Sequence, residues 1–138
     1  MDAQLKKILV IEDDQFIREL YTRTLQKEGF AVLSAEDGAQ GLDLVRQQPN
    51  LVLLDIMLPK LNGLEFLKTI KADPALRPIP VLLLTNLGQT DVIDRAFALE
   101  AQGYLMKMRS MPGQVVEYVK KFLADPNFKM DMRSLDLE

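Results

Sequence analysis

The stretch Leu51-Val52-Leu53-Leu54-Asp55 decides the fold, because four apolar residues run directly into a carboxylate. A continuous apolar run of this length is typical of a strand whose two faces are both buried in a parallel sheet. In open α/β sheets the functional crevice lies just outside the carboxyl ends of such strands. Asp55 is therefore expected at the edge where ligands bind.

Two further segments end in charged residues in the same way. The apolar run Ile8–Ile11 is followed by the acids Glu12-Asp13-Asp14, and the segment Tyr104–Met106 is followed by Lys107. If all three segments are parallel strands of one sheet, several acids and one amine meet at the same edge as Asp55.

The composition limits the classes of protein and of chemistry. A chain of 138 residues, 48% hydrophobic and 27% charged, is expected to form one soluble domain. It contains no cysteine and no histidine, which excludes disulfides, thiolate nucleophiles, sulfur-ligated zinc and imidazole bases. Any resident metal is thus expected to be a hard, oxygen-preferring cation such as Mg²⁺.

Charge and hydropathy also bear on partners and location. A net charge of -3 argues against a broad nucleic-acid-binding surface. No apolar run approaches the roughly 18 residues of a membrane helix. Residues 1–7 lack the apolar segment of a secretory signal, so we expect a cytoplasmic protein without membrane contact.

Five apolar runs alternate with amphipathic stretches along the chain. The expected strands are Ile8 to Ile11, Ala31 to Ala35, Leu51 to Leu54, Val81 to Leu84 and Tyr104 to Met106. The helices are marked by apolar residues at helical spacing, which we expect to be core: Ile17, Leu20, Tyr21 and Leu25; Leu42 and Val45; Phe66, Leu67 and Ile70; Val92, Ala96 and Leu99; and Val115, Val116, Val119, Phe122 and Leu123. This alternation predicts an α/β fold: a doubly wound sandwich with a parallel sheet, right-handed crossovers and helices on both faces.

Several residues are expected to set helix ends. Asp14 is a candidate N-cap for the first helix, and Gly29 is a natural stop after it. Asp37 can cap the second helix, with Gln40 at the capping-box position. Pro112 is expected near the start of the fifth helix.

The acids at the strand ends suggest a chemistry. Clustered carboxylates repel one another unless a cation shares the site. Glu12, Asp13 and Asp55 suit Mg²⁺, and Lys107 would supply a countercharge. Such a site binds phosphoryl groups well, and with no serine–histidine pair the plausible nucleophile is a carboxylate, as in aspartyl-phosphate chemistry. Asp55 is the candidate.

Together these elements resemble the receiver domain of bacterial two-component response regulators, a chemotaxis-type signalling module. The matching elements are, in order, Glu12-Asp13, Asp55 with Pro59 and Gly63 in DIMLPKLNG, Thr85 at the end of VLLLT, and Lys107 after Tyr104. The resemblance covers about Lys6 to Ala124. It implies a (βα)5 flavodoxin-like sandwich with a five-stranded parallel sheet of order 2-1-3-4-5. We expect residues 4–124 to form the receiver domain and residues 125–138 to be a C-terminal extension without a domain of its own.

The resemblance also implies a role for each matched residue. Asp55 would be the phosphoacceptor, taking its phosphoryl group from a phosphohistidine on a sensor histidine kinase or a phosphotransfer protein. Asp13 would hold Mg²⁺ directly and Glu12 through water, with Asp55 and the backbone carbonyl of Met57 as further ligands. The chain would thus catalyse its own phosphorylation and slow dephosphorylation, without turnover on an external substrate.

Signal output would follow from the new charge. Lys107 would bind the phosphoryl oxygens, and Thr85 would hydrogen-bond the phosphoryl group and draw its loop inward, letting Tyr104 change rotamer. The surface of the fourth helix, fifth strand and fifth helix would then bind a downstream target protein. The fifteen residues after Leu123 are too few for a DNA-binding module, so we expect no direct nucleic-acid contact; phosphorylation-dependent dimerisation stays open.

The chain departs from the family pattern at several positions. Met108 follows Lys107 where most receivers have a proline, and Asn86 follows the switch threonine where the family favours a small residue. The positions that tune dephosphorylation are Met57 and Leu87, neither of which can orient an attacking water. We therefore expect a long-lived phosphorylated form.

Two alternatives remain at this point. A pseudo-receiver would keep the fold and act as a constitutive protein-interaction scaffold. An unrelated α/β enzyme or nucleotide binder is disfavoured, because the chain lacks both G-x-G-x-x-G and G-x-x-x-x-G-K-[ST]. Taken singly, Thr85 could merely end a strand and Tyr104 could belong to the core.

Overall fold

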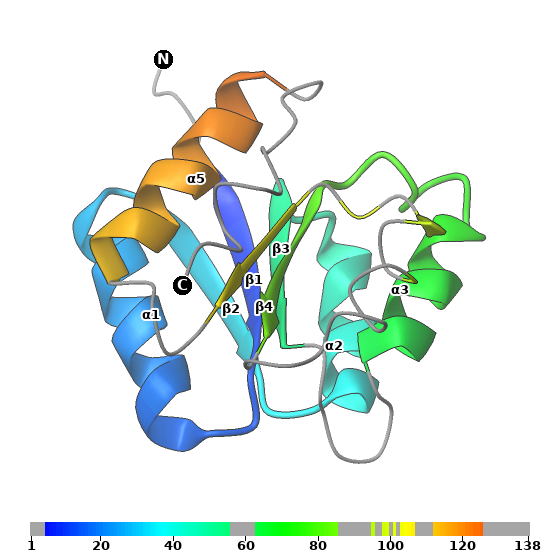
Figure 1. Ribbon diagram of the computed structural model, residues 1–138, viewed down its shortest axis with the longest axis horizontal. Coiled ribbons are helices and arrows are strands. Elements are labelled where there is room, and N and C mark those ends of the chain that lie inside the picture. Colours follow the sequence, from blue (N-terminus) through cyan, green and yellow to red (C-terminus); the bar gives the residue numbers. More distant parts are fainter. Residues whose placement is uncertain are drawn as a thin grey trace.

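The fold is a parallel sheet between two layers of helices (Figure 1). The computed structural model describes residues 5–55, 63–85, 95, 98–99, 101, 103–106 and 112–125. The strands are β1 (Lys7–Ile11), β2 (Ala31–Ala35), β3 (Leu51–Asp55), β4 (Val81–Thr85) and β5 (Gly103–Met106). The helices are α1 (Gln15–Lys27), α2 (Gly38–Leu44), α3 (Gly63–Lys71) and α5 (Pro112–Ala124), and a short 3-10 helix, Val45–Gln47, follows α2.

The sheet has the strand order β2-β1-β3-β4-β5, and all neighbouring strands are parallel. This confirms the predicted doubly wound topology. Helices α1 and α5 cover one face of the sheet, and α2 and α3 cover the other (Figure 1). Strand β3 occupies the centre, which explains why its sequence is an uninterrupted apolar run.

Two hydrophobic clusters fill the space between the sheet and the helix layers. Alternate residues of the central strands enter different clusters: Val52 and Leu54 face the cluster containing Phe66, whereas Leu51 and Leu53 face the other. Because successive side chains of a strand point to opposite faces, both halves of the run are buried.

One apolar position of α1 contradicts the expectation that its stripe is core. Tyr21 and Leu25 are buried as expected, but Leu20 is 38% exposed and Phe16 is 76% exposed. At about 100° per residue, Leu20 lies well around the helix from Tyr21, on the side away from the sheet.

The fourth helix was expected around Val92, Ala96 and Leu99, and most of this region lies outside the described residues. Of its described part, Arg95 and Ala98 are helical, and the backbone N–H of Leu99 donates to the carbonyl of Arg95 at 3.1 Å. Leu99 packs against the cluster that contains Phe66 on α3. Residues 126–138 of the expected C-terminal extension also lie outside the described residues.

Both helices that follow β1 and β2 begin at the expected aspartates. Asp14 Oδ1 accepts from the backbone N–H of Ile17 at 3.0 Å, and Asp37 Oδ1 accepts from that of Gln40 at 2.8 Å. The Gln40 side chain accepts from the N–H of Glu36 at 2.7 Å, one residue before the position that a capping box would use. These caps fix where each helix leaves the carboxyl edge of the sheet.

Helix α1 ends in a Schellman motif. The N–H of Phe30 donates to the carbonyl of Leu25 at 3.1 Å, and the N–H of Gly29 donates to that of Gln26 at 3.0 Å. Gly29 has a φ of 93°, in the left-handed region that favours glycine. The motif turns the chain directly into β2.

In the described part of the chain, no helix has the length and apolar character needed to cross a membrane.

Candidate functional site

The candidate site lies at the carboxyl edge of the sheet, where β1 and β3 end side by side. Ile11 of β1 and Leu54 of β3 are register partners in the parallel ladder. Glu12 follows Ile11 just beyond β1, and Asp55 follows Leu54 as the last residue of β3, so the two acids occupy equivalent positions at the ends of neighbouring strands. One carboxylate oxygen from each of Glu12, Asp13 and Asp55 lies within 4.8 Å of the others. The structure thus brings together the three acids that the sequence indicated.

The three acids differ in their exposure to solvent. Glu12 is 0% exposed and Asp55 is 2% exposed, whereas the side chain of Asp13 is exposed. Buried carboxylates that lie close together are costly unless a cation or hydrogen bonds compensate their charge. The cluster therefore has two carboxylates fixed in the protein and a third on the solvent side.

The donor set fits a hard divalent cation. Three carboxylate oxygens within 4.8 Å of one another can share one ion. Mg²⁺ prefers oxygen ligands, accepts one or two carboxylates directly and keeps several waters. Because Asp13 is exposed, an ion held by these acids would be accessible from solvent.

The segment between β1 and α1 is held by several hydrogen bonds. The N–H of Glu12 donates to the carbonyl of Ala35 in β2 at 3.0 Å. Glu12 Oε2 accepts from the N–H of Asp14 at 3.0 Å, and Arg18 Nη1 donates to the carbonyl of Glu12 at 2.8 Å. Asp14 itself caps α1, which explains why the third consecutive acid is not a member of the cluster.

Arg18 was not predicted from the sequence. The available signal was a basic residue in the first turns of a helix that directly follows an acidic segment. Helical side chains lean toward the N-terminus of their helix, so this arginine can reach back to the acids.

The strand that follows β3 in the sheet brings Thr85 to the same edge. Asp55 pairs with Leu84 of β4, and Thr85 comes next in the chain. Thr85 in turn pairs with Met106, the last residue of β5. The backbone of the expected switch threonine therefore lies beside the strand that carries the acid.

Several predicted site features lie outside the described residues. These are Lys107, Met57 and Pro59, together with Met108, Asn86 and Leu87, at which the chain departs from the family pattern. The backbone of Tyr104 lies in β5, paired with Leu83, but its side chain is not among those that the structure describes. Gly63, which belongs to the matched segment DIMLPKLNG, is the first residue of α3.

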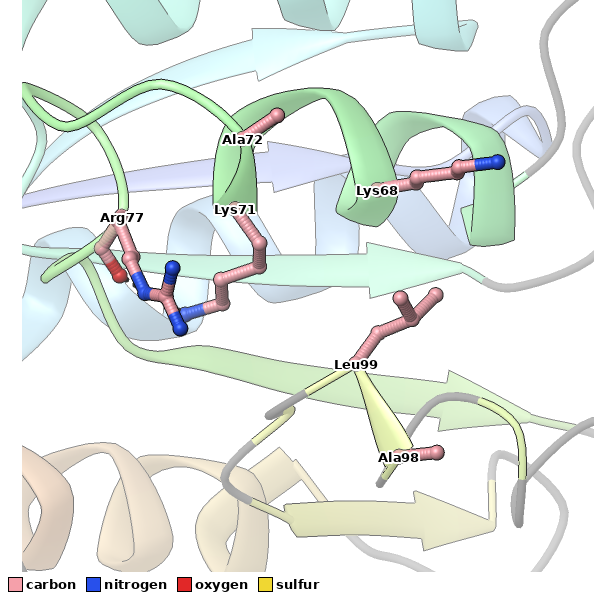
Figure 2. A pocket seen from close by; sticks show the side chains of 6 residues that line it. All are labelled: Lys68, Lys71, Ala72, Arg77, Ala98 and Leu99. Carbon is pink, nitrogen blue, oxygen red and sulfur yellow. Dashed lines mark hydrogen bonds between the residues drawn. The ribbon is translucent and has the colours of Figure 1, made fainter.

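A separate concave region lies near the opposite, amino edge of the sheet. It has a volume of about 260 Å³ and lies between the end of α3, the segment that leads into β4 and the turn at Leu99 (Figure 2). Its lining residues are Lys68, Lys71, Ala72, Arg77, Ala98 and Leu99. None of them belongs to the acidic cluster.

Lys71 has a structural role in this region. Its side chain is 8% exposed and points from α3 toward Arg77 (Figure 2). The ammonium group donates to the carbonyls of Arg77 at 3.0 Å and Ile79 at 3.2 Å. Lys71 thereby ties the end of α3 to the segment entering β4.

Comparison with known proteins agrees with this geometry. The family model described as the response regulator receiver domain matches residues 8–120. The polar-differentiation response regulator DivK of Brucella anthropi is 31% identical over 121 residues, covering 87% of this chain and 98% of DivK. The DNA-binding response regulator MtrA of Mycobacterium tuberculosis is 40% identical over 110 residues, covering 78% of this chain but only 46% of MtrA. The chain therefore spans about half the length of the MtrA proteins it matches.

Solved structures show the same fold. The chemotaxis response regulator CheY4 of Vibrio cholerae superposes with a TM-score of 0.79 at 25% identity, covering 86% of this chain and 98% of CheY4. A putative response regulator from Chloroflexus aurantiacus gives a TM-score of 0.81 at 27% identity, covering 88% of this chain and 99% of the other. The similarity to both extends over almost the whole of each solved chain.

Proposed function

This chain belongs to the response regulator receiver domain family, whose general function is phosphorylation-dependent switching, and from that membership we propose a specific site and mechanism. Asp55 is the phosphoacceptor of a two-component system in the bacterial cytoplasm, and a phosphohistidine on a sensor histidine kinase or phosphotransfer protein is the donor. The observation that carries the proposal is the convergence of the Glu12, Asp13 and Asp55 carboxylates within 4.8 Å at the carboxyl edge of the sheet. The receiver domain comprises residues 4–124, and residues 125–138 are an extension of it.

The metal site consists of the same acids. Asp13 and Asp55 bind Mg²⁺ directly, Glu12 binds it through water, and the carbonyl of Met57 is a further ligand. When bound, the ion neutralises the carboxylates and the phosphoryl oxygens, which would otherwise repel one another. The hydrogen bond from the Asp14 amide holds the Glu12 carboxylate in place for this role.

Phosphoryl transfer uses a carboxylate oxygen of Asp55 as the nucleophile. This oxygen forms a bond to phosphorus as the phosphorus–nitrogen bond of the donor breaks, and the electron pair of that bond returns to the imidazole. The product is an acyl phosphate on Asp55. Lys107 binds the phosphoryl oxygens and balances their charge.

The phosphoryl group then alters a surface that a partner protein reads. Thr85 hydrogen-bonds the phosphoryl group, and Tyr104 changes rotamer in response. The register supports this coupling, because Thr85 follows the Leu84 that pairs with Asp55, and Tyr104 lies in the next strand. The fourth helix, β5 and α5 form the face that a downstream target protein binds.

The test compares the wild-type protein with Asp55→Asn in the presence of Mg²⁺ and acetyl phosphate. We expect intact-mass measurement to show one added phosphoryl group in the wild type and none in the variant. Asp43→Asn is the matched control, because Asp43 is an exposed acid of α2 outside the cluster, and it should label normally. Beryllofluoride should likewise shift backbone amide signals in the NMR spectrum of the wild type but not in that of Asp55→Asn.

An unlabelled wild type would contradict the proposal. If beryllofluoride also left its spectrum unchanged, the pseudo-receiver scaffold would become the better account. Labelling of Asp55→Asn to the wild-type level would instead place the phosphoacceptor elsewhere.

A further inference from the structure

We propose that Arg18 is a positioning residue for the metal-binding acids. Its guanidinium group holds the backbone of Glu12 and Asp13 so that both side chains face Asp55. The inference rests on the proposed function, since it concerns the same Mg²⁺ site.

The geometry places Arg18 directly behind the acidic segment. Its backbone N–H donates to the carbonyl of Asp14 at 2.9 Å, in the first turn of α1. Its Nη1 donates to the carbonyl of Glu12 at 2.8 Å and lies 3.5 Å from that of Asp13. The first contact is a charge-assisted hydrogen bond of good length, and the second is long and correspondingly weaker.

Only residues 12–14 link β1 to α1, so the backbone contacts of these residues determine where the Glu12 and Asp13 side chains point. Glu12 is also anchored through its own N–H and its carboxylate. Within the part of the chain that the structure describes, Asp13 is hydrogen-bonded through its carbonyl to Arg18. Rotation of the backbone about the Cα of Asp13 would redirect the Asp13 side chain. The guanidinium opposes that rotation, because it contacts the Glu12 carbonyl in the peptide before Asp13 and the Asp13 carbonyl in the peptide after it.

The positive charge of Arg18 also offsets repulsion among the acids, so charge and positioning must be separated. Arg23 provides the comparison, because it carries the same charge on the same helix. Its side chain is 79% exposed and lies 3.9 Å from the carboxylate of Glu19, an i,i+4 pair on the surface. Removing Arg23 therefore removes one cation from α1 without touching the acidic segment.

The experiment measures Mg²⁺ affinity by calorimetric titration of wild type, Arg18→Met, Arg18→Lys and Arg23→Met. We expect Arg18→Met to bind Mg²⁺ about 10- to 100-fold more weakly, the usual cost of losing a residue that orients metal ligands. Arg23→Met should change the Kd by about twofold or less, since an exposed charge is screened. Arg18→Lys should give an intermediate Kd, because an ammonium keeps the charge but lacks the planar fork.

Thermal unfolding without Mg²⁺ distinguishes positioning from a general structural role. We expect Arg18→Met and Arg23→Met to have similar metal-free Tm values, and Mg²⁺ to raise the Tm of Arg18→Met less than that of Arg23→Met. A lowered metal-free Tm for Arg18→Met with wild-type Mg²⁺ affinity would overturn the inference. Equal weakening of Mg²⁺ binding in Arg18→Met and Arg23→Met would also overturn it, because charge alone would then explain the effect.

Failure of this inference is distinguishable from failure of the proposed function. If Arg18 has no positioning role, the wild type still binds Mg²⁺ and is still labelled at Asp55. If the proposed function is wrong, the wild type itself shows neither Mg²⁺ binding nor labelling by acetyl phosphate.

Discussion

Asp14 donates its backbone N–H to Glu12 Oε2 at 3.0 Å, while its own carboxylate caps α1 through the N–H of Ile17. The start of the helix and the orientation of a buried acid are thus coupled through one residue. The side chain of the neighbouring Asp13 is exposed and lies on the solvent side of the acidic cluster.

Replacing Asp14 by alanine should therefore mainly reduce the stability of the fold and have a smaller effect on the affinity for Mg²⁺. Loss of the N-cap should lower the free energy of unfolding by about 1 kcal/mol. The backbone donor to Glu12 is retained, so Mg²⁺ affinity should fall less than in Asp13→Asn. Asp14→Asn is the control, because asparagine caps about as well as aspartate. Urea denaturation measures the difference, and equal stability of the alanine and asparagine variants would contradict the capping role.

Neutralising one acid of the cluster should stabilise the metal-free protein. Asp55→Asn removes one of three mutually repelling carboxylates, so its Tm without Mg²⁺ should exceed that of wild type, by a gain in unfolding free energy of order 1 kcal/mol. Added Mg²⁺ should raise the wild-type Tm and leave that of Asp55→Asn nearly unchanged. Differential scanning fluorimetry with and without a chelator measures both effects. If Mg²⁺ raised both Tm values equally, the ion would not bind at this cluster.

Lys71 offers a test of the packing at the other edge of the sheet. In Lys71→Met the carbonyls of Arg77 and Ile79 lose a buried cationic donor, and we expect a loss of about 2 to 3 kcal/mol in unfolding free energy. Lys68→Met changes an exposed lysine on the same helix and should cost about 0.5 kcal/mol or less. Chemical denaturation distinguishes them, and similar stabilities would show that the two hydrogen bonds contribute little.

The phosphorylated form should be long-lived. Met57 and Leu87 stand at the positions that tune dephosphorylation in receivers. Leucine has no hydrogen-bonding group and the methionine thioether is only a weak acceptor, so neither side chain is suited to orienting an attacking water. Protein labelled at Asp55 should therefore keep its phosphoryl group for minutes after the donor is removed. Intact-mass measurement over time tests this, and decay within seconds would refute it.

The strands and the acidic cluster could be predicted because each depends on a local pattern. Residues 51–55 are buried on both faces, so the run is apolar without interruption, and the acid that ends it is conspicuous. Glu12 and Asp55 follow two such runs directly, and parallel strands necessarily bring such residues to one edge. The order of the strands could not be predicted from the alternation of strands and helices, because that alternation is compatible with several strand orders. It was predicted from the resemblance to the receiver family.

The residues that were missed act through backbone carbonyls. Arg18 and Lys71 each donate to two carbonyl groups of nearby loops, and such contacts leave no periodic trace in the sequence. The exposure of Leu20 was missed for a different reason. A mixed apolar stripe on α1 fits more than one rotation of the helix, and packing of Tyr21 and Leu25 against the sheet selects among them.

Because Ile11 pairs with Leu54, the sheet sets the distance between the acids that follow these two residues. Neighbouring strands lie about 4.8 Å apart, and this spacing, rather than the loops, determines how far the Glu12 and Asp55 backbones are separated. A slip of one residue between β1 and β3 would move Asp55 by about 3.3 Å and turn every buried side chain of β3 to the other face. Selection for a well-packed core therefore also preserves the spacing of the acids. Glu12 and Asp55 can move apart along the strands only if the pairing of β1 with β3, and with it the packing of the core, is lost.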